Sequence, residues 1–123
     1  PALYPEGRAL WDSLVLEATG DGIMDAALLI VYEARLRPEE LRFVPWVEGQ
    51  WQKVARALDM LESRWMAHLY GPLDIGQIAV GCALGYLDLR HSGRNWREGR
   101  ASLAAWFARI SERESFRATA PQA

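Results

Sequence analysis

The sequence lacks the features that mark secreted, metal-binding and membrane-spanning proteins. Its single cysteine, Cys82, excludes a disulfide framework and is typical of a cytosolic protein. Its two histidines do not combine with cysteine or acidic residues at metal-ligand spacing, so we expect no metal and interpret both as structural. No signal peptide is visible, and no apolar run reaches the roughly 20 residues that a bilayer span needs. We therefore expect a cytoplasmic protein without a membrane segment.

An excess of one charge is also lacking, as is any strand pattern. Lys and Arg total 14 and Asp and Glu total 16, so the net charge of −2 gives no support for nucleic-acid binding. Hydrophobic residues make up 50% of 123 residues, which is enough to bury a core. We find neither an internal repeat nor the alternation of apolar and polar residues that strands show. The predicted fold class is all-α, a multi-helix bundle forming one domain over residues 1–123.

The stretch 73–89 organises the chain, and it predicts a buried central helix over residues 74–90. Asp74 precedes Gln77 by three residues, as in a capping box, in which Asp74 accepts the N–H of Gln77 and the Gln77 amide reaches back to the N–H of Asp74. No residue from 78 to 87 is charged, and a helix that is apolar all round is a buried one. Three glycines punctuate the helix: Gly76, Gly81 and Gly85. Because each costs about 1 kcal/mol against Ala in a helix interior, they indicate neighbours packed close to the backbone.

A long first helix is predicted over residues 5–36. Pro5 suits its first turn, and Pro38 disfavours helical geometry at the residue before it. The closely spaced Gly20 and Gly22 favour one bent helix, because no proline intervenes, with two helices joined by a glycine turn as the alternative. The apolar stripe that we expect to face the core follows the helical period: Leu10, Leu14, Ala18, Leu28 and Val31.

A second long helix is predicted from Pro45 to near Tyr70, where Gly71 and Pro72 end it. Seven residues of this helix, all apolar but one, are spaced alternately by four and three, and this spacing predicts a narrow seam against another helix. These are Val47, Trp51, Val54, Leu58, Leu61, Trp65 and His68.

The last third of the chain predicts one further helix and a short turn. Asn95 and Glu98 have the spacing of a second capping box, which would open a helix that runs to about Ser111. Ser115 would cap a final short turn. The inner face of the longer helix is expected to comprise Leu103, Trp106, Phe107 and Ile110.

This order of elements resembles the C-terminal helical domain of cytosolic glutathione transferases. The resemblance is carried by the long first helix, whose end at residues 32–38 is similar to a bacterial subgroup, by the segment 56–61, by the capped central helix and by the closing segment 106–113. Asp74 and Gln77 stand where the family has Ser or Thr and Asp. The resemblance covers nearly the whole chain and implies the fold of that domain.

The resemblance also implies what this chain does not contain. The family's N-terminal thioredoxin-like domain, which binds glutathione and supplies the residue that stabilises or replaces its thiolate, has no counterpart here. The chain would then be the C-terminal part of a longer protein and inactive by itself. Glutathione would be the co-substrate, bound mainly by the missing domain. The implied partners are that domain, a second copy in a homodimer and a small hydrophobic electrophile.

An acidic face on the first helix is a candidate for contact with glutathione. Glu17, Asp21 and Asp25 are spaced by four residues and therefore share one face, where like charges repel. In the family, an acidic residue on the equivalent helix can reach across the dimer to the ammonium group of glutathione. The resemblance thus implies a glutathione-binding role for Glu17 or Asp21, and the alternative is a solvated face.

Four residues are candidates, by the same resemblance, for the hydrophobic wall that orients the electrophile near the thiolate. Ile23 and Met24 follow the two glycines of the first helix, and Tyr86 lies in the second half of the central helix. Phe116 would cover the site from the tail. A mostly apolar cleft of this kind binds and orients small molecules. The alternative for each residue is an ordinary place in the core.

Other side chains receive structural interpretations. Asp88 is predicted to pair with an arginine from another helix or with His91 one turn later. We expect Cys82 to be buried and inert, because burial raises the pKa of a thiol. Three tryptophans near the starts of the two long helices fit either a dimer interface or the core: Trp11, Trp46 and Trp51.

The resemblance implies that the chain builds the electrophile pocket and part of the dimer interface of a glutathione transferase. One alternative is a non-catalytic interaction module, since some proteins with this domain use it for assembly. Another is a helical domain of different function, because fold alone does not fix activity. An apolar cleft beside Ile23, Met24 and Tyr86 would favour the enzyme. A filled cleft, with an exposed apolar patch on the two long helices, would favour the interaction module.

Overall fold

The computed structural model describes residues 2–122, and the secondary structure within that range is entirely helical, as the sequence predicted. The first half contains α1 (Ala9–Leu36), the short 3-10 helix η1 (Glu39–Leu41) and α2 (Val44–Met60). A π-helical turn, η2 (Leu61–Trp65), leads from α2 into α3 (Met66–Leu69). The second half contains α4 (Ile75–Arg90), the 3-10 helix η3 (Ser92–Arg94), α5 (Ala101–Ile110) and α6 (Glu114–Ala118).

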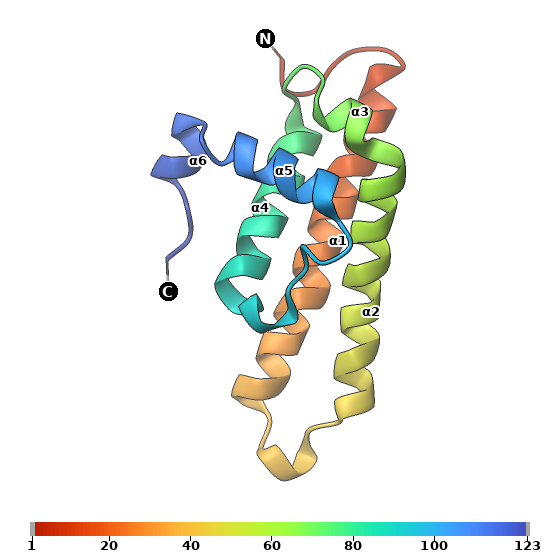
Figure 1. The fold of residues 1–123 in the computed structure, drawn as a ribbon. Coiled ribbons are helices and arrows are strands. Elements are labelled where there is room, and N and C mark those ends of the chain that lie inside the picture. The colour runs from red at the N-terminus through yellow and green to blue at the C-terminus, as the bar shows by residue number, and fades with distance from the viewer. Residues whose placement is uncertain (1, 123) are drawn as a thin grey trace.

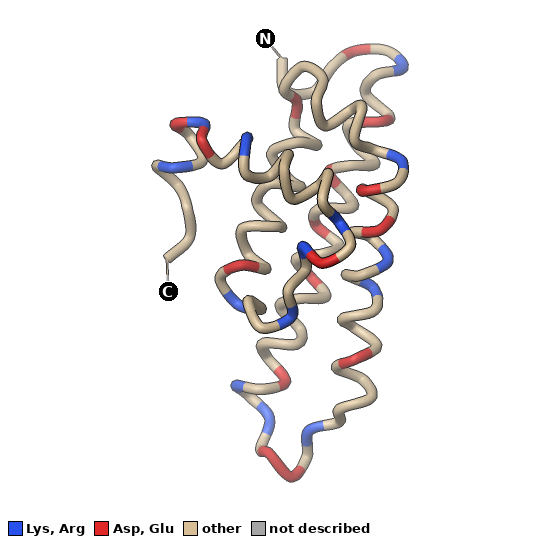
Figure 2. The backbone as a smooth tube through the Cα atoms, in the orientation of Figure 1, with Lys and Arg blue, Asp and Glu red and all other residues tan. Residues whose placement is uncertain are grey.

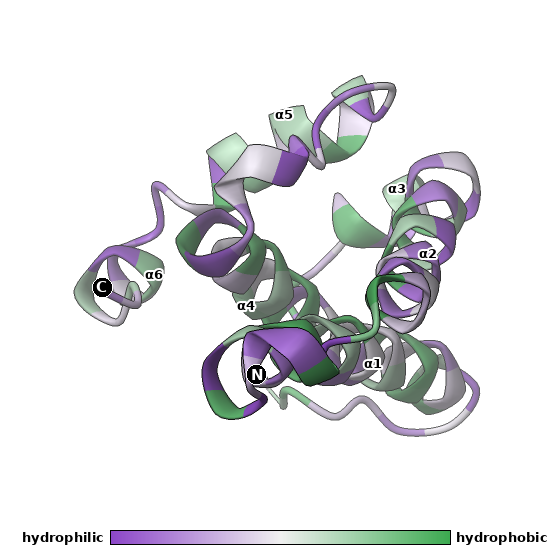
Figure 3. Cartoon of the chain, turned by 90° about the horizontal axis from the view of Figure 1, so that it is seen from below, coloured by the Kyte–Doolittle hydropathy of each residue, from purple (hydrophilic) through white to green (hydrophobic). Residues whose placement is uncertain are grey.

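The bundle is organised around α4, which lies alongside α1. The chain descends along α1, returns along α2 and descends again along α4, so that α1 and α4 run parallel (Figure 1). Viewed along the bundle, α1, α2 and α4 form one group, with α5 crossing on one side and α6 lying outside (Figure 3). Leucine is the most frequent residue of the core between them, and Trp96 and Trp106 close the core on the α5 side.

The packing of α1 against α4 corrects the stripe that hydropathy predicted for α1. Leu10, Leu14 and Val31 are half-buried and Ala18 is exposed, whereas the buried face comprises Ser13, Leu16, Gly20, Ile23, Ala26, Ala27, Ile30 and Glu33. Leu28 is also only half-buried. Half of this face consists of small residues, which suits the close approach of the two helices. Apolar residues also lie outside the buried face, so hydropathy alone does not select it.

The helix α1 continues without a break through Gly20 and Gly22, and Gly20 lies where α1 approaches α4 closely. A Cβ at Gly20 would lie 2.8 Å from the backbone carbonyl carbon of Ala79 on α4, so only glycine fits there. Gly22 has open space around it. The alternative of two helices is therefore wrong. The helix begins at Ala9 rather than at Pro5, because Gly7 turns the chain with a φ of +71°.

The seam of the second helix is where the sequence placed it. Val54, Leu58 and Leu61 are fully buried, and the remaining members of the seam are half-buried. Helical structure runs from Val44 to Leu69, but it passes through the π-helical turn η2 that the sequence did not predict.

Two predicted helix caps near the C-terminus are wrong. Asn95 is not an N-cap: it takes a left-handed φ of 46° at the end of η3, and α5 begins only at Ala101. Trp96 is the reason, since its ring is buried and tied to α4, which holds residues 95–100 in a turn. Ser115 lies inside α6 and does not cap it. The end of α5 at Ile110 and its buried face agree with the prediction.

Candidate functional site

The N-terminus of α4 is fixed by a buried carboxylate. Asp74 Oδ1 accepts the N–H of Gln77 at 3.1 Å, which is the predicted cap. Asp74 Oδ2 accepts the Ser13 hydroxyl of α1 and His68 Nε2 of α3, each at 2.7 Å. One side chain therefore joins three helices at the point where α4 begins.

The second half of the predicted capping box is wrong. The Gln77 amide does not reach back to Asp74 but donates to carbonyls of the preceding loop, at Gly71 (3.2 Å) and at Pro72. Burial raises the cost of ionising Asp74, but the hydrogen bonds from Ser13, His68 and the Gln77 N–H outweigh it and hold its pKa below the ordinary value. Asp74 is thus ionised and structural.

A cavity of about 600 Å³ opens on the side of α4 that faces α6. Met24 of α1, Tyr86 of α4 and Phe116 of α6 all line it, so the structure brings three of the four predicted wall residues together. The other lining residues include Gly81, Cys82, Gly85, Phe107, Ser111 and the tail segment Thr119–Pro121. Arg117 also lines the cavity and pairs with Glu112. The lining is otherwise uncharged and mostly apolar, which suits a small hydrophobic ligand.

Phe116 is seated on the backbone of α4. A Cβ at Gly81 would lie 2.6 Å from the Phe116 ring, so the absence of a side chain at Gly81 lets the ring reach the helix. Gly85 has open space beyond its backbone and contributes to the hollow itself. Two of the three glycines of α4, Gly76 and Gly81, therefore have the close neighbours that the sequence predicted.

The remaining predicted site residues lie elsewhere. Ile23 is 1% exposed and packs in the core, so it does not line the cavity beside its neighbour Met24. Glu17 accepts the Tyr4 hydroxyl at 2.6 Å, and this bond raises the pKa of Tyr4. Asp21 is exposed and makes no hydrogen bond with residues 2–122. Neither acid lines the cavity.

Cys82 corrects the expectation that α4 is buried all round. The residue is exposed and lines the cavity, although partial burial does raise the pKa of its thiol, as expected. The sequence does contain a pattern that could have predicted Cys82 to lie beside the cavity. Gly81, Cys82, Gly85 and Tyr86 are spaced by one and four residues and therefore share one face of α4.

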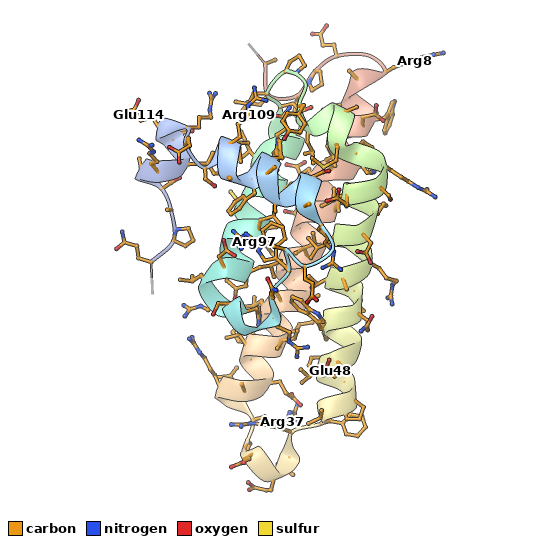
Figure 4. All side chains as sticks on the ribbon, viewed as in Figure 1. Arg8, Arg37, Glu48, Arg97, Arg109 and Glu114 are labelled. Atoms are coloured by element: carbon orange, nitrogen blue, oxygen red, sulfur yellow. The ribbon has the colours of Figure 1, made fainter. Side chains whose placement is uncertain are left out.

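Asp88 anchors the far end of α4 to the turn before α5. It accepts Trp96 Nε1 at 2.8 Å and two guanidinium nitrogens of Arg97 at 2.7 and 2.8 Å. Burial opposes its ionisation, but these partners hold its pKa below the ordinary value. Arg97 lies against α4 in Figure 4 and stacks over the Trp96 ring at 4.5 Å. The predicted arginine partner is confirmed, but it comes from a turn rather than a helix.

His91 is not the partner of Asp88, because its Nε2 donates to the carbonyl of Ala27 on α1 at 2.9 Å. No group of three or more His, Cys, Asp or Glu residues within 2–122 is placed to hold a metal ion. In the same range, no helix is both long enough and apolar enough to span a bilayer.

Comparisons with known proteins agree on one family. The family model of the glutathione S-transferase C-terminal domain matches residues 44–109. A curated relative, the uncharacterized GST-like protein YibF of Escherichia coli strain K12, is 34% identical over 108 residues. That alignment covers 86% of this chain and 53% of the relative.

Solved structures give the same result at higher identity. A glutathione transferase family member from Pseudomonas fluorescens Pf-5 with bound S-(propanoic acid)-glutathione is 47% identical and superposes with a TM-score of 0.96, covering 98% of this chain and 63% of that one. A crystal structure of a P. fluorescens Pf-5 family member with bound glutathione gives the same identity, the same TM-score and the same coverage of this chain, and 60% of that chain is covered.

A more distant glutathione S-transferase, from Methylobacillus flagellatus KT with glutathione bound, is 34% identical with a TM-score of 0.88, and 98% of this chain and 61% of that chain are covered. The chain thus spans between about half and two thirds of the length of these relatives. The match over residues 44–109, together with the fold, shows that this chain belongs to the glutathione S-transferase C-terminal domain family.

Proposed function

We propose that this chain forms the electrophile-binding wall of a glutathione transferase. The observation that carries the proposal is the open cavity of about 600 Å³ in which Met24, Tyr86 and Phe116 meet from three different helices. An apolar hollow without an acid in its lining suits a small uncharged or hydrophobic electrophile. Glutathione would be the co-substrate, bound mainly by an N-terminal thioredoxin-like domain that this chain does not include.

The chemistry assigned to this half is orientation. In the conjugation, the glutathione thiolate attacks an electrophilic carbon, a sulfur–carbon bond forms, and a leaving group departs or a neighbouring carbon takes up a proton. Holding the electrophile in an apolar wall next to the thiolate converts a bimolecular encounter into a step between fixed neighbours. The 47% identical relative with bound S-(propanoic acid)-glutathione, a thioether of glutathione, supports this assignment.

The acidic face of α1 is proposed to contact glutathione across a homodimer. Asp21 is the better placed acid, because it is exposed and has no partner within residues 2–122, whereas Glu17 holds the Tyr4 hydroxyl. A carboxylate at Asp21 would pair with the ammonium group of glutathione. Asp21→Asn should then raise the KM for glutathione and leave the KM for the electrophile unchanged. Equal effects on both constants, or none, would remove Asp21 from the site.

The experiment that tests the wall uses the full-length protein in a glutathione-conjugation assay. Tyr86→Ala removes a ring that lines the cavity, and we expect kcat/KM for a hydrophobic electrophile to fall about tenfold, as loss of an oriented apolar contact predicts. Tyr32→Ala is the matched control, since Tyr32 is exposed on α1 and lies outside this cavity. The KM for glutathione should stay constant in both variants. Identical kinetics for the two variants would overturn the proposal.

A second candidate function is assembly with a second copy or another protein. It is favoured by exposed apolar residues where α1 ends and α2 begins, which we call the apolar tip. Large apolar side chains crowd the loop end of α1 and α2, where Leu36 is 74%, Val44 67% and Phe43 61% exposed. An apolar surface of this kind on the two long helices fits the proposed homodimer contact or a protein partner. Leu36→Ser with Val44→Ser should shift the full-length protein from dimer to monomer in sedimentation velocity. An unchanged mass would exclude this tip from the dimer contact.

A further inference from the structure

Three aromatic rings line the electrophile cavity, and one of them is held differently from the other two. They belong to Tyr86 of α4, Phe107 of α5 and Phe116 of α6. Within residues 2–122, Phe107 is the only one of the three that takes part in an aromatic or cation–π pair. Phe116 rests on the backbone at Gly81 and belongs to a helix of five residues. Phe107 is therefore the ring that is supported from outside the cavity.

The support of Phe107 comes from the segment that joins α4 to α5. The Trp96 ring meets the Phe107 ring edge to face, with the ring centroids 5.8 Å apart and an interplanar angle of 72°, an arrangement that aromatic pairs prefer. The guanidinium carbon of Arg97 lies 4.5 Å from the Trp96 centroid and 5.7 Å from the Phe107 centroid, so one cation spans both rings. Neither Trp96 nor Arg97 lines the cavity. Both residues can therefore act on the cavity only through a residue that does line it.

Asp88 ties this support to α4, the helix that contributes four residues to the cavity lining. Its carboxylate accepts Trp96 Nε1 at 2.8 Å, together with Nη1 and Nη2 of Arg97 at 2.7 and 2.8 Å. A bidentate pair of this kind fixes the plane of the guanidinium group as well as its position. Asp88 follows Tyr86 by two residues on the same helix. The Phe107 ring is thus held in place relative to the α4 wall of the cavity.

A second arginine of the same segment has nearly the same arrangement but points to another part of the molecule. Figure 2 shows several basic positions along this segment. Arg94 Nη1 and Nη2 lie 3.0 and 2.8 Å from the Glu48 carboxylate of α2. Its guanidinium carbon lies 5.0 Å from the centroid of the Trp51 ring, which does not line the cavity. Arg94 therefore provides a matched comparison for Arg97, with the same fork on an acid and the same stacking on an indole.

We infer that Arg97, held by Asp88, positions Phe107 and thereby limits the width of the electrophile that the cavity accepts. The inference rests on the proposed conjugation, and it names the residue that selects the substrate there. The flexible side chain of Met24 and the short helix of Phe116 can adapt to a ligand, whereas the supported Phe107 ring forms a wall that does not yield. Phe107 determines specificity because it contacts the electrophile, and Arg97 is a positioning residue because it acts through Phe107.

The test measures conjugation by the full-length protein with two electrophiles of different width, benzyl chloride and naphthylmethyl chloride. In both, the glutathione thiolate forms a sulfur–carbon bond at the CH₂ carbon while the carbon–chlorine bond breaks and chloride leaves. Arg97→Ala should raise kcat/KM for the naphthyl compound relative to the benzyl compound about fivefold, the scale of one aromatic contact. Arg94→Ala is the matched control and should leave this ratio at the parental value. The KM for glutathione should stay constant in both variants.

A double variant distinguishes positioning of Phe107 from any other effect of Arg97. Phe107→Leu removes the ring, so adding Arg97→Ala in that background should not change the ratio of the two kcat/KM values further. Arg97→Lys keeps the charge but loses the planar fork, and it should shift the ratio in the same direction as Arg97→Ala. This milder variant keeps the test decisive even if Arg97→Ala does not fold. An Arg97 effect that persists in Phe107→Leu, or an equal effect of Arg94→Ala, would overturn the inference.

The contact between the Phe107 and Trp96 rings can be followed without any substrate, by the nuclear Overhauser effect between their protons. We expect this signal to weaken in Arg97→Ala and to persist in Arg94→Ala. A signal of parental strength in Arg97→Ala would overturn the positioning role whatever the kinetics.

Failure of the inference is distinguishable from failure of the proposed function. If Tyr86→Ala impairs conjugation while Arg97→Ala leaves the ratio of the two electrophiles unchanged, the wall stands and the inference is wrong. If Tyr86→Ala behaves like its control Tyr32→Ala, the proposed function is wrong and the inference that rests on it is wrong as well.

Discussion

The two sides of α4 are built in different ways. The side facing α1 is closed by backbone-level contacts: Gly20 meets Ala79, and Asp74 binds Ser13 at 2.7 Å. On the side facing α6, the close contact with the backbone of α4 is made by a side chain, the ring of Phe116 on Gly81, and a cavity of about 600 Å³ is left. One helix thus packs closely on one side and borders an open cavity, the proposed ligand wall, on the other. The difference teaches that an uncharged helix need not be buried all round.

The largest expected effect is the loss of the Asp74 carboxylate. Asp74→Ala removes the helix cap, leaves His68 Nε2 without its acceptor, and leaves the Ser13 hydroxyl only the Ala9 carbonyl at 3.3 Å. We therefore expect the free energy of unfolding to fall by about 2–4 kcal/mol. Chemical denaturation measures it. Asp21→Ala is the control, because Asp21 is an exposed acid on α1. Its midpoint should not fall below that of the parent, since the substitution relieves repulsion and favours the helix. A midpoint for Asp74→Ala that matches the parent would refute the structural role of this carboxylate.

The next largest effect on stability is a difference between alanine substitutions at two glycines of α1. Gly20→Ala puts a Cβ 2.8 Å from the Ala79 carbonyl, and backbone cannot give way locally, so we expect a loss of about 1–3 kcal/mol. Gly22→Ala meets nothing within 4 Å and gains helix propensity, so it should stabilise the protein by about 0.5–1 kcal/mol. Opposite signs in the two melting temperatures are expected. Equal shifts would mean that the α1–α4 contact is not close at Gly20.

A smaller effect depends on pH. The pKa of Asp74 is lower in the folded protein than the unfolded value of about 3.9, so its charge contributes stability above that pH. The contribution is lost as pH falls through the lowered folded pKa. The stability difference between the parent and Asp74→Asn should therefore shrink below about pH 3.9. A difference that stays constant from pH 6 to pH 3, as rough bounds around that value, would contradict the pKa shift.

The smallest effect sharpens the comparison between the two sides. A Cβ at Gly81 would come within 2.6 Å of the Phe116 ring, which is closer than the contact at Gly20. Phe116 sits on the short helix α6 and can turn aside, so Gly81→Ala should change stability by less than about 1 kcal/mol. Conjugation kinetics should respond, because the displaced ring reshapes the cavity. A loss of stability as large as that of Gly20→Ala would show that both sides of α4 are rigid.

Local patterns predicted much of the fold. The all-α class, the cap of Asp74 on Gln77 and the buried members of the α2 seam depend on neighbours within a few residues, and the sequence displays those. The buried face of α1 was missed because apolar residues lie on several sides of that helix. Contacts with α4, which lies far along the chain, decide which side is buried, as at Gly20 and Ser13. The start of α5 was missed for the same reason, since the bond from Trp96 to Asp88 holds the preceding turn.

The candidate site was only partly predictable. Family resemblance led to Met24, Tyr86 and Phe116, and the structure places them around one cavity, while Ile23 lies in the core. Cys82 and Phe107 line the same cavity but were assigned to a buried helix and a buried face. The sequence cannot show which side of an uncharged helix stays uncovered, because that depends on where α6 and the tail settle. The roles of Glu17 and Asp21 remain predictions.

The most direct test of the central difference compares Tyr86→Ala with Gly20→Ala in one conjugation assay, at a temperature where both variants are folded. If the α6 side of α4 is the ligand wall and the α1 side is the support, the KM for the electrophile should rise in Tyr86→Ala and stay at the parental value in Gly20→Ala. Their melting temperatures should change in the opposite pattern, with the larger loss in Gly20→Ala. An electrophile KM that rises in both variants, or only in Gly20→Ala, would contradict this assignment of the two sides.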